Sequence, residues 1–168
     1  MSDVPQASGQ PVLWPHAGAS PDWHEEIRAI FGYWRAIHPV DGIPGRQHFD
    51  PAAVKRLLPG VWLLDVQKEP FRLRYRLVGT RVAAMIGHDV TGLWVDVAHA
   101  DATHRPGYFD RYRGVVETRV PSWRRGRPTL WVHQDYSIIE NIVLPLAANG
   151  REVDMLLAST AIHDSAGR

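Results

Sequence analysis

The strongest hydrophobic pattern along the chain predicts an amphipathic helix over residues 22–38. Apolar side chains recur there at steps of three and four residues, which places them on one face of an α-helix. Ser20 or Asp22 suits the N-cap, and Pro39 ends the helix. The stripe consists of Trp23, Ile27, Ile30, Phe31, Trp34 and Ile37. It has to be covered, and the pattern leaves open whether the protein's own sheet or a second copy covers it.

Short apolar and alternating runs further along the chain predict strands. Residues 61–66 form a compact apolar run, and residues 71–78 alternate strictly between apolar and basic side chains. Period two is typical of a half-buried strand, and charges on its outer side protect a sheet edge from aggregation. The apolar face would carry Phe71, Leu73, Tyr75 and Leu77, and the outer face Arg72, Arg74 and Arg76. Such an arginine row could instead bind an anion or a partner.

Three more strands are predicted over residues 121–132, 136–147 and 152–162. Asn149-Gly150, between the last two, is a strong signal for a hairpin turn. The last two runs carry apolar groups on both faces, which indicates central strands with something covering each side.

Helices are predicted before and between these strands. Asp50-Pro51 opens a short helix, residues 80–86 form a second one that Gly87 stops, and residues 108–118 form a longer one. Residues 88–106 are irregular, with about one helical turn. One antiparallel sheet with helices gathered in the middle of the chain is an α+β architecture.

Composition narrows the class of protein. The chain of 168 residues carries 19 basic and 18 acidic side chains, and a net charge of +1 gives no general attraction to nucleic acid or acidic membranes. It has no cysteine, which excludes disulfides and a cysteine-linked flavin. Residues 1–20 are rich in proline, glycine and small polar side chains and predict a flexible tail before one domain over residues 21–168. With no leader and no bilayer-length apolar run, we expect a cytoplasmic protein without membrane insertion.

The order of elements resembles the PAS fold, a five-stranded antiparallel sheet with helices inserted between strands two and three, here preceded by the amphipathic helix. More narrowly, the residues resemble a bacterial family of short stand-alone PAS-like proteins over roughly residues 23–162. The matching pieces are Tyr33-Trp34, Ile43-Pro44-Gly45-Arg46, Asp50-Pro51, Leu57-Leu58-Pro59, Leu63-Leu64-Asp65-Val66, Tyr75-Arg76-Leu77-Val78-Gly79-Thr80, Gly87-His88-Asp89-Val90-Thr91-Gly92 and Leu144-Pro145-Leu146. His88 departs from the family pattern, because the resemblance implies a permanently basic residue at this position.

The resemblance implies a sensory or regulatory module, not an enzyme, and it assigns no catalytic residue. A PAS pocket lies between the inner face of the sheet and the inserted helices and is lined mainly by apolar groups. By analogy, the pocket candidates are Leu64, Tyr75, Leu77, Met85, Ile86, Trp94, Phe109, Tyr112, Ile142 and Leu144. A small apolar molecule or metabolite bound there would shift the population of states of the N-terminal helix or of a partner surface.

The expected partners are a second copy of the chain, through the N-terminal helix, and a signalling protein. Residues 163–168 are all that follow the last predicted strand, so we expect any output to act in trans. Two alternatives stay open: a small enzyme on a cone-like α+β fold with a His/Asp pair, and a ligand-free dimeric scaffold. A strongly shifted histidine pKa in a deep pocket would favour the enzyme, and a core without a cavity would favour the scaffold.

Histidines offer other chemistry that the pattern does not favour. His99, Asp101 and His104 are the residue types of a metal site, but positions 99 and 104 do not share a helical face. His88, His99 and His104 lie where a haem ligand would, and nothing singles one out. We therefore expect neither a metal nor haem, and the cofactor, if any, stays unassigned.

Two further runs contain residue types that are found in functional sites. His133, Asp135 and Ser137 are the residue types of a catalytic triad, but a strand would place them in a row along one face and not around one atom. Arg119 and the run 123–127 are basic and aromatic, as in nucleic-acid sites, but no recognition helix accompanies them. We expect a solvated hairpin there and no nucleic-acid partner.

Overall fold

The computed structural model describes residues 12–13, 19–128 and 138–163. Six strands in these residues form one antiparallel sheet in the order β1-β4-β5-β6-β2-β3. They are β1 (Val12–Leu13), β2 (Val61–Gln67), β3 (Arg72–Val78), β4 (Ser122–Gly126), β5 (Ile138–Leu146) and β6 (Met155–His163). Strands β2 to β6 are the five that the sequence predicts. β1 pairs with β4 and lies inside the segment predicted to be a flexible tail. Predicted strand residues 129–132 and 136–137 fall outside the described residues.

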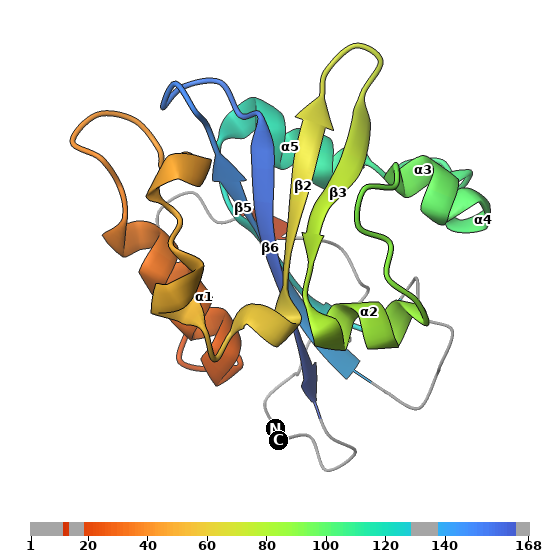
Figure 1. The fold of residues 1–168 in the computed structure, drawn as a ribbon, viewed down its shortest axis with the longest axis horizontal. Coiled ribbons are helices and arrows are strands. Elements are labelled where there is room, and N and C mark those ends of the chain that lie inside the picture. Colours follow the sequence, from red (N-terminus) through yellow and green to blue (C-terminus); the bar gives the residue numbers. More distant parts are fainter. Residues whose placement is uncertain (1–11, 14–18, 129–137, 164–168) are drawn as a thin grey trace, which may run out of the picture.

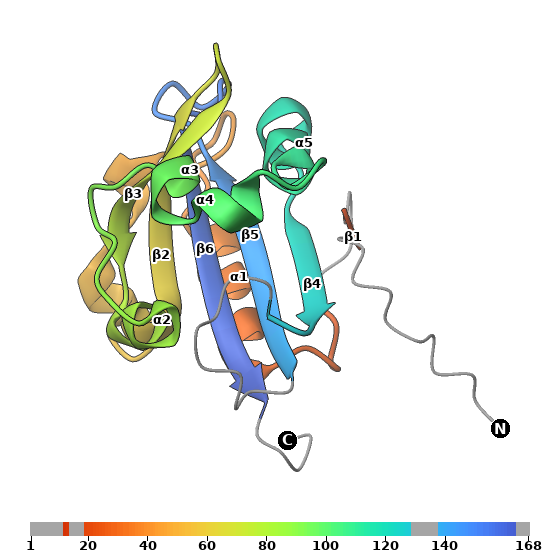
Figure 2. The same ribbon diagram turned by 90° about the vertical axis from the view of Figure 1, so that its right-hand side faces the viewer.

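Helices lie on both faces of this sheet. α1 (Glu25–Ala36) packs on one face, and the helices inserted between β3 and β4 lie on the other (Figure 1). The inserted helices are α2 (Thr80–Ile86), α3 (Val95–Ala98), α4 (Ala100–Thr103) and α5 (Asp110–Thr118). Figure 2 looks onto them, with α1 behind the sheet. We call the two sides of the sheet the α1 face and the inserted-helix face.

The apolar stripe of α1 is buried against the protein's own sheet. Trp23, Ile27, Ile30, Phe31 and Trp34 form one cluster with inward-facing residues of β2, β5 and β6. Of the two coverings that the pattern left open, the one by the protein's own sheet is confirmed for these residues. Their side chains fill the core of one chain, and a dimer through this helix stays a prediction. Ile37, at the helix end, is half-buried.

The start of α1 differs from the prediction by a few residues. His24 is the N-cap, and its Nδ1 accepts a hydrogen bond from the Glu26 backbone N–H at 3.2 Å. Ser20, one of the two predicted caps, instead accepts from the backbone N–H of Asp22 at 3.3 Å and so closes the preceding turn.

A β-bulge in β3 changes the face on which Leu77 lies. Leu63 pairs with Leu77 and Leu64 with Tyr75, so Arg76 is an extra residue in the pairing of β2 with β3. An extra residue reverses the alternation beyond it. Tyr75 therefore packs on the inserted-helix face, while Leu77 packs with the α1 cluster. The prediction that one face carries both residues is wrong for this reason.

The turn and cap predictions are confirmed at several places. The Asp50 side chain caps the turn Pro51–Val54, α2 ends at Gly87 with φ 103°, and Asn149 Oδ1 accepts backbone N–H groups of the hairpin turn. The short helix predicted to open at Asp50-Pro51 is instead two 3-10 turns, at Pro51–Val54 and Leu58–Gly60, and a further 3-10 turn at Arg46–His48 precedes them.

Candidate functional site

The inserted-helix face carries a group of aromatic rings with polar ends. The rings of Trp62 and Tyr75 are 6.2 Å apart, and those of Trp62 and Tyr112 are 6.4 Å apart. The rings of Tyr108 and Tyr112 are also 6.4 Å apart. The Tyr75 hydroxyl lies 2.8 Å from His99 Nε2. The wall between sheet and helices therefore offers hydroxyl groups as well as apolar surface.

His99 is the titratable imidazole of this group. Its pKa is lowered, chiefly by burial and secondly by the charge of His88. Burial likewise raises the pKa of Tyr75, so the phenol stays protonated at neutral pH. Within residues 19–128 and 138–163, His99 contacts the Tyr75 phenol and not a carboxylate, so these residues do not form the His/Asp pair that the enzyme alternative requires.

Arg111 of α5 ties the inserted helices to the sheet. Its Nε donates to Ser122 Oγ at 2.9 Å and its Nη1 to Asn141 Oδ1 at 2.6 Å. Its Nη2 donates to the backbone carbonyls of the same two residues, at 2.9 and 3.1 Å. Asn141 in turn donates from Nδ2 to Thr160 Oγ1 at 2.9 Å, and Trp62 Nε1 lies 3.2 Å from that hydroxyl. One chain of hydrogen bonds thus runs from α5 across four strands, β4, β5, β6 and β2.

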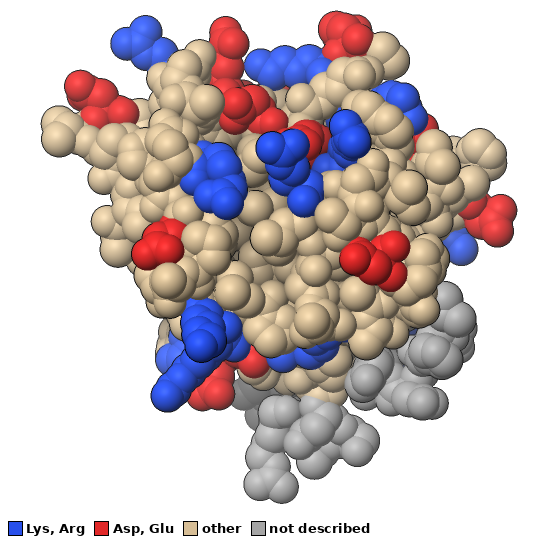
Figure 3. Space-filling view, in the orientation of Figure 1, with Lys and Arg blue, Asp and Glu red and all other residues tan. Residues whose placement is uncertain are grey.

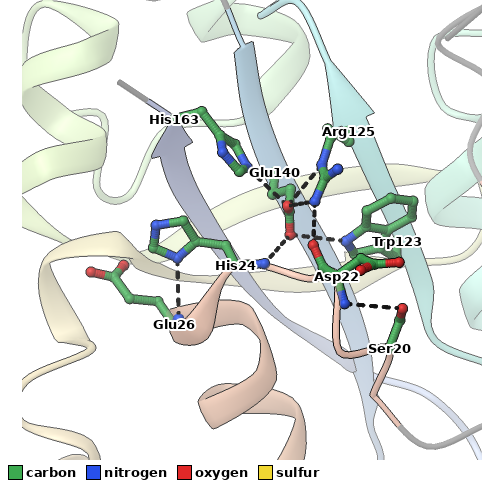
Figure 4. A network of polar contacts seen from close by, with 8 residues as sticks. All are labelled: Ser20, Asp22, His24, Glu26, Trp123, Arg125, Glu140 and His163. Atoms are coloured by element: carbon green, nitrogen blue, oxygen red, sulfur yellow. Dashed lines mark hydrogen bonds and ion pairs between the residues drawn. The ribbon is translucent and has the colours of Figure 1, made fainter. Parts of the chain in front are cut away.

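A second polar group lies on the α1 face, around the fully buried carboxylate of Glu140 (Figure 4). Oε1 accepts from Arg125 Nε at 2.8 Å and lies 2.8 Å from His163 Nε2. Oε2 accepts from the His24 backbone N–H at 2.8 Å and from Trp123 Nε1 at 3.2 Å. Because His24 caps α1, this carboxylate fixes the start of α1 to the sheet.

The Glu140 group gives a prediction for the pH dependence of stability. Burial alone raises the pKa of the carboxyl, but the donors from His24, Arg125, His163 and Trp123 outweigh it and hold the pKa below its ordinary value. A lowered folded-state pKa adds stability above the unfolded value of about 4.3, and this stability is lost as pH falls through the folded value. We expect the free energy of unfolding of Glu140→Gln to lie below that of wild type by a constant amount near neutral pH. Urea unfolding should show this gap narrowing below about pH 4.3, and a gap that widens on acidification would contradict the assignment.

The structure divides the predicted pocket residues between the two faces. Leu64, Tyr75, Ile86, Phe109 and Tyr112 pack together on the inserted-helix face. Leu77, Ile142 and Leu144 lie in the α1 cluster on the opposite face, so their prediction as pocket residues is wrong. For Ile142 and Leu144 the reason is strand alternation, since Asn141 and Val143 are the residues of β5 that face the inserted helices.

The two remaining pocket candidates lie elsewhere. Met85 is buried in α2, outside both apolar clusters. Trp94 lies at the edge of the sheet, bridged to Arg74, with the Arg72 guanidinium 4.2 Å from its ring. Arg72 also forms a bidentate ion pair with Asp96. The outer arginines of β3 therefore already have some partners within the protein.

The basic run of β4 is not the solvated hairpin that the sequence predicts. Arg124 and Arg125 are half-buried, and Arg125 is paired with Glu140. On the face shown in Figure 3, acidic and basic side chains are interspersed. His133, Asp135 and Ser137 lie outside the described residues. Among the described residues, no three His, Asp or Glu side chains are grouped to hold a metal ion.

A hollow of about 880 Å³ opens at the end of the sheet where the β2–β3 hairpin, α5 and the β5–β6 turn meet. Phe71, Val116 and Val153 give it an apolar part, and charged side chains of both signs line the rest. None of the predicted pocket residues lines it.

Sequence reasoning missed Glu140, Asn141 and Arg111. A signal was present for the first two, since adjacent Glu and Asn interrupt an otherwise apolar central strand. Buried polar groups in such positions need hydrogen-bond partners, and the pattern does not say which residues supply them.

A sheet with central order β4-β5-β6-β2-β3, and helices inserted between β3 and β4, defines a sensory module of the PAS type. A family model described as a PAS domain matches residues 23–160. The chain belongs to this PAS domain family, whose members are generally sensory and not catalytic.

Other comparisons add little to this assignment. The structure of an RNA-binding light-oxygen-voltage receptor is similar at 14% identity and a TM-score of 0.49, and the match covers 92% of this chain and 38% of that one. No curated protein matches the sequence. None of the helices in the described residues is long and apolar enough to cross a membrane.

Proposed function

We propose that this PAS domain binds a small ligand on the inserted-helix face and passes the resulting change through α1 to a partner protein. The observation that carries the proposal is that Asn141 and Glu140 are neighbours on β5. Neighbouring strand residues point to opposite faces. Here each anchors a buried polar group on its own face, Asn141 with Arg111 of α5 and Glu140 with the cap of α1. A shift of β5 that disturbs one group therefore disturbs the other.

A second connection supports the same route. Arg81 of α2 donates to the Thr160 carbonyl at 3.0 Å and forms an ion pair with Glu26 of α1. Thr160 is also the residue whose hydroxyl accepts from Asn141. Gly60 leaves room for this contact, since a Cβ there would lie 2.2 Å from Arg81 Nη2. Helices on opposite faces are thus joined around the sheet as well as through it.

Native mass spectrometry of the purified protein, compared with its denatured mass, tests the ligand. We expect a bound mass that leaves on denaturation, because the inserted-helix face presents hydroxyl and imidazole groups beside apolar surface. Two negative results together would exclude ligand binding: no extra mass on the protein, and no rise of its melting temperature with any compound of a broad metabolite set. They would favour the alternative of a ligand-free dimeric scaffold.

The route through β5 predicts an effect of Asn141→Ala on the opposite face. Removing the side chain leaves Arg111 Nη1 and Thr160 Oγ1 without their side-chain partner on β5, and we expect this to loosen the strand that holds the α1 cap. We expect the local opening free energy of the α1 amides to fall by roughly 0.5–2 kcal/mol, measured by hydrogen exchange. Val143→Ala is the matched control. Val143 lies two residues further along the same strand and on the same face, but its side chain is apolar and forms no hydrogen bond. Equal protection losses at α1 in both variants would rule out a specific route through Asn141.

A further inference from the structure

Four arginines in the described part of the chain have carboxylate partners. They are Arg72 with Asp96, Arg76 with Asp65, Arg81 with Glu26 and Arg125 with Glu140. Two other arginines, Arg111 and Arg124, belong to the inserted-helix face. Their hydrogen bonds within the described residues go only to neutral acceptors.

Adjacent residues of β4 show the contrast directly. Arg125 points to the α1 face, where the buried Glu140 carboxylate neutralises it. Arg124 points to the opposite face, and its one hydrogen bond in the described residues runs from Nη2 to the Arg127 carbonyl at 2.7 Å. Its Nε and Nη1 groups have no acceptor among the described residues. A guanidinium carries five N–H donors, so most of the Arg124 donors remain available to bind another group.

Arg111 and Arg124 are close enough for their charges to interact. The pKa of Arg111 is lowered to about 10, chiefly by burial and to a smaller extent by the neighbouring Arg124 charge. Burial also lowers the pKa of Arg124. Both residues nevertheless keep some solvent-accessible surface. So does Tyr112, whose hydroxyl interacts electrostatically with both guanidinium groups. Partly desolvated cations that keep accessible surface and lack a carboxylate are placed to attract an anion.

The surroundings indicate what kind of anion fits. Four aromatic rings on this face follow one another at centroid distances of 6.2 to 6.4 Å, in the order Tyr75, Trp62, Tyr112 and Tyr108. Aromatic walls accept a flat apolar body, and phenol hydroxyls donate to its polar end.

We propose that the ligand of the inserted-helix face is a small aromatic carboxylic acid, bound as the anion by Arg124 beside Arg111 and packed against the tyrosine and tryptophan rings. This inference rests on the proposed function and names the ligand class of that same site. Arg124 is the group that meets the carboxylate, and Arg111, held by Ser122 and Asn141, supplies a fixed positive charge behind it.

Matched pairs of probes test the charge. Benzoate, phenylacetate and indole-3-acetate are titrated by calorimetry against the full chain, each beside its uncharged amide. We expect at least one acid to bind, and its amide to bind roughly ten- to a hundredfold more weakly, as loss of a charge-assisted hydrogen bond requires. Arg124→Gln should weaken the acid by a similar factor and leave the amide nearly unchanged. Arg127→Gln, an exposed arginine next to the same strand, is the control and should change neither.

Each contrary result has a distinct meaning. If an amide binds as tightly as its acid, or if folded Arg124→Gln binds the acid as well as wild type does, the anion proposal is wrong while ligand binding at this face stands. If no acid binds, the anion proposal is also wrong. Native mass spectrometry then separates the two claims, because a neutral bound compound keeps the proposed function and an empty protein removes it.

Discussion

We expect Glu140→Ala to lower the free energy of unfolding by about 3 kcal/mol, measured by urea denaturation at neutral pH. The change leaves Arg125 without its carboxylate and leaves the His24 N–H and Trp123 Nε1 without an acceptor. Breaking a buried ion pair from one side costs about 3–5 kcal/mol. The lower end applies because the Arg125 side chain is 36% exposed and regains water.

The control for this prediction is Glu152→Ala, at an exposed position in the β5–β6 turn. A surface substitution of that kind changes the free energy of unfolding by no more than about 0.5 kcal/mol. Glu140→Gln keeps the size of the side chain and serves if the alanine variant does not fold. Similar losses for Glu140→Ala and Glu152→Ala would mean that the buried carboxylate does not hold α1 to the sheet.

In the proposed function, the position of Glu140 matters more than the free energy that its contacts contribute. A buried carboxylate surrounded by four donors is costly to leave partly satisfied, so the group tends to be made or broken as a unit. The same strand presents Asn141 to the opposite face, one residue further along. In the proposed function, these paired polar groups on the two faces of one strand carry the change from one face to the other, which a purely apolar sheet would not do.

Much of the fold follows from the sequence because it depends on local pattern. Steps of three and four define α1, and Gly87 ends α2 at a positive φ, as predicted. The α+β order of the five main strands, with helices between the second and third, is likewise confirmed. These features are set by residues within a few positions of one another.

The candidate site depends on pairing, which local pattern does not contain. The alternation in residues 71–78 is regular, yet Arg76 bulges because of how β3 pairs with β2, and Leu77 changes face. The run at 123–127 shows two adjacent arginines, but only the strand that lies beside it distinguishes them, since β5 brings Glu140 to Arg125. The sequence therefore predicts where strands lie better than it predicts which polar groups meet.

We expect Trp34→Ala to lower the free energy of unfolding by about 3–5 kcal/mol, the range for truncating a buried aromatic side chain. Trp34 is 6% exposed, its ring stacks on Phe31 at 6.0 Å, and its Nε1 donates to the Pro145 carbonyl at 2.9 Å. Truncation opens a cavity between α1 and β5 and leaves that carbonyl without its partner. Urea unfolding measures the loss, with Arg28→Ala on the exposed side of α1 as the control.

The same variant decides how the helix is covered in solution. If the stripe packs on the protein's own sheet, as the structure has it, Trp34→Ala is destabilised and its mass by light scattering equals that of wild type at the same concentration. If the stripe were a seam between two copies, Trp34→Ala would turn a dimer into a folded monomer, and its stability would depend on protein concentration only in the wild type. A helix packed in cis keeps its outer side, including Arg28 and Gly32, free for a partner, and this is the side through which the proposed response would leave the domain.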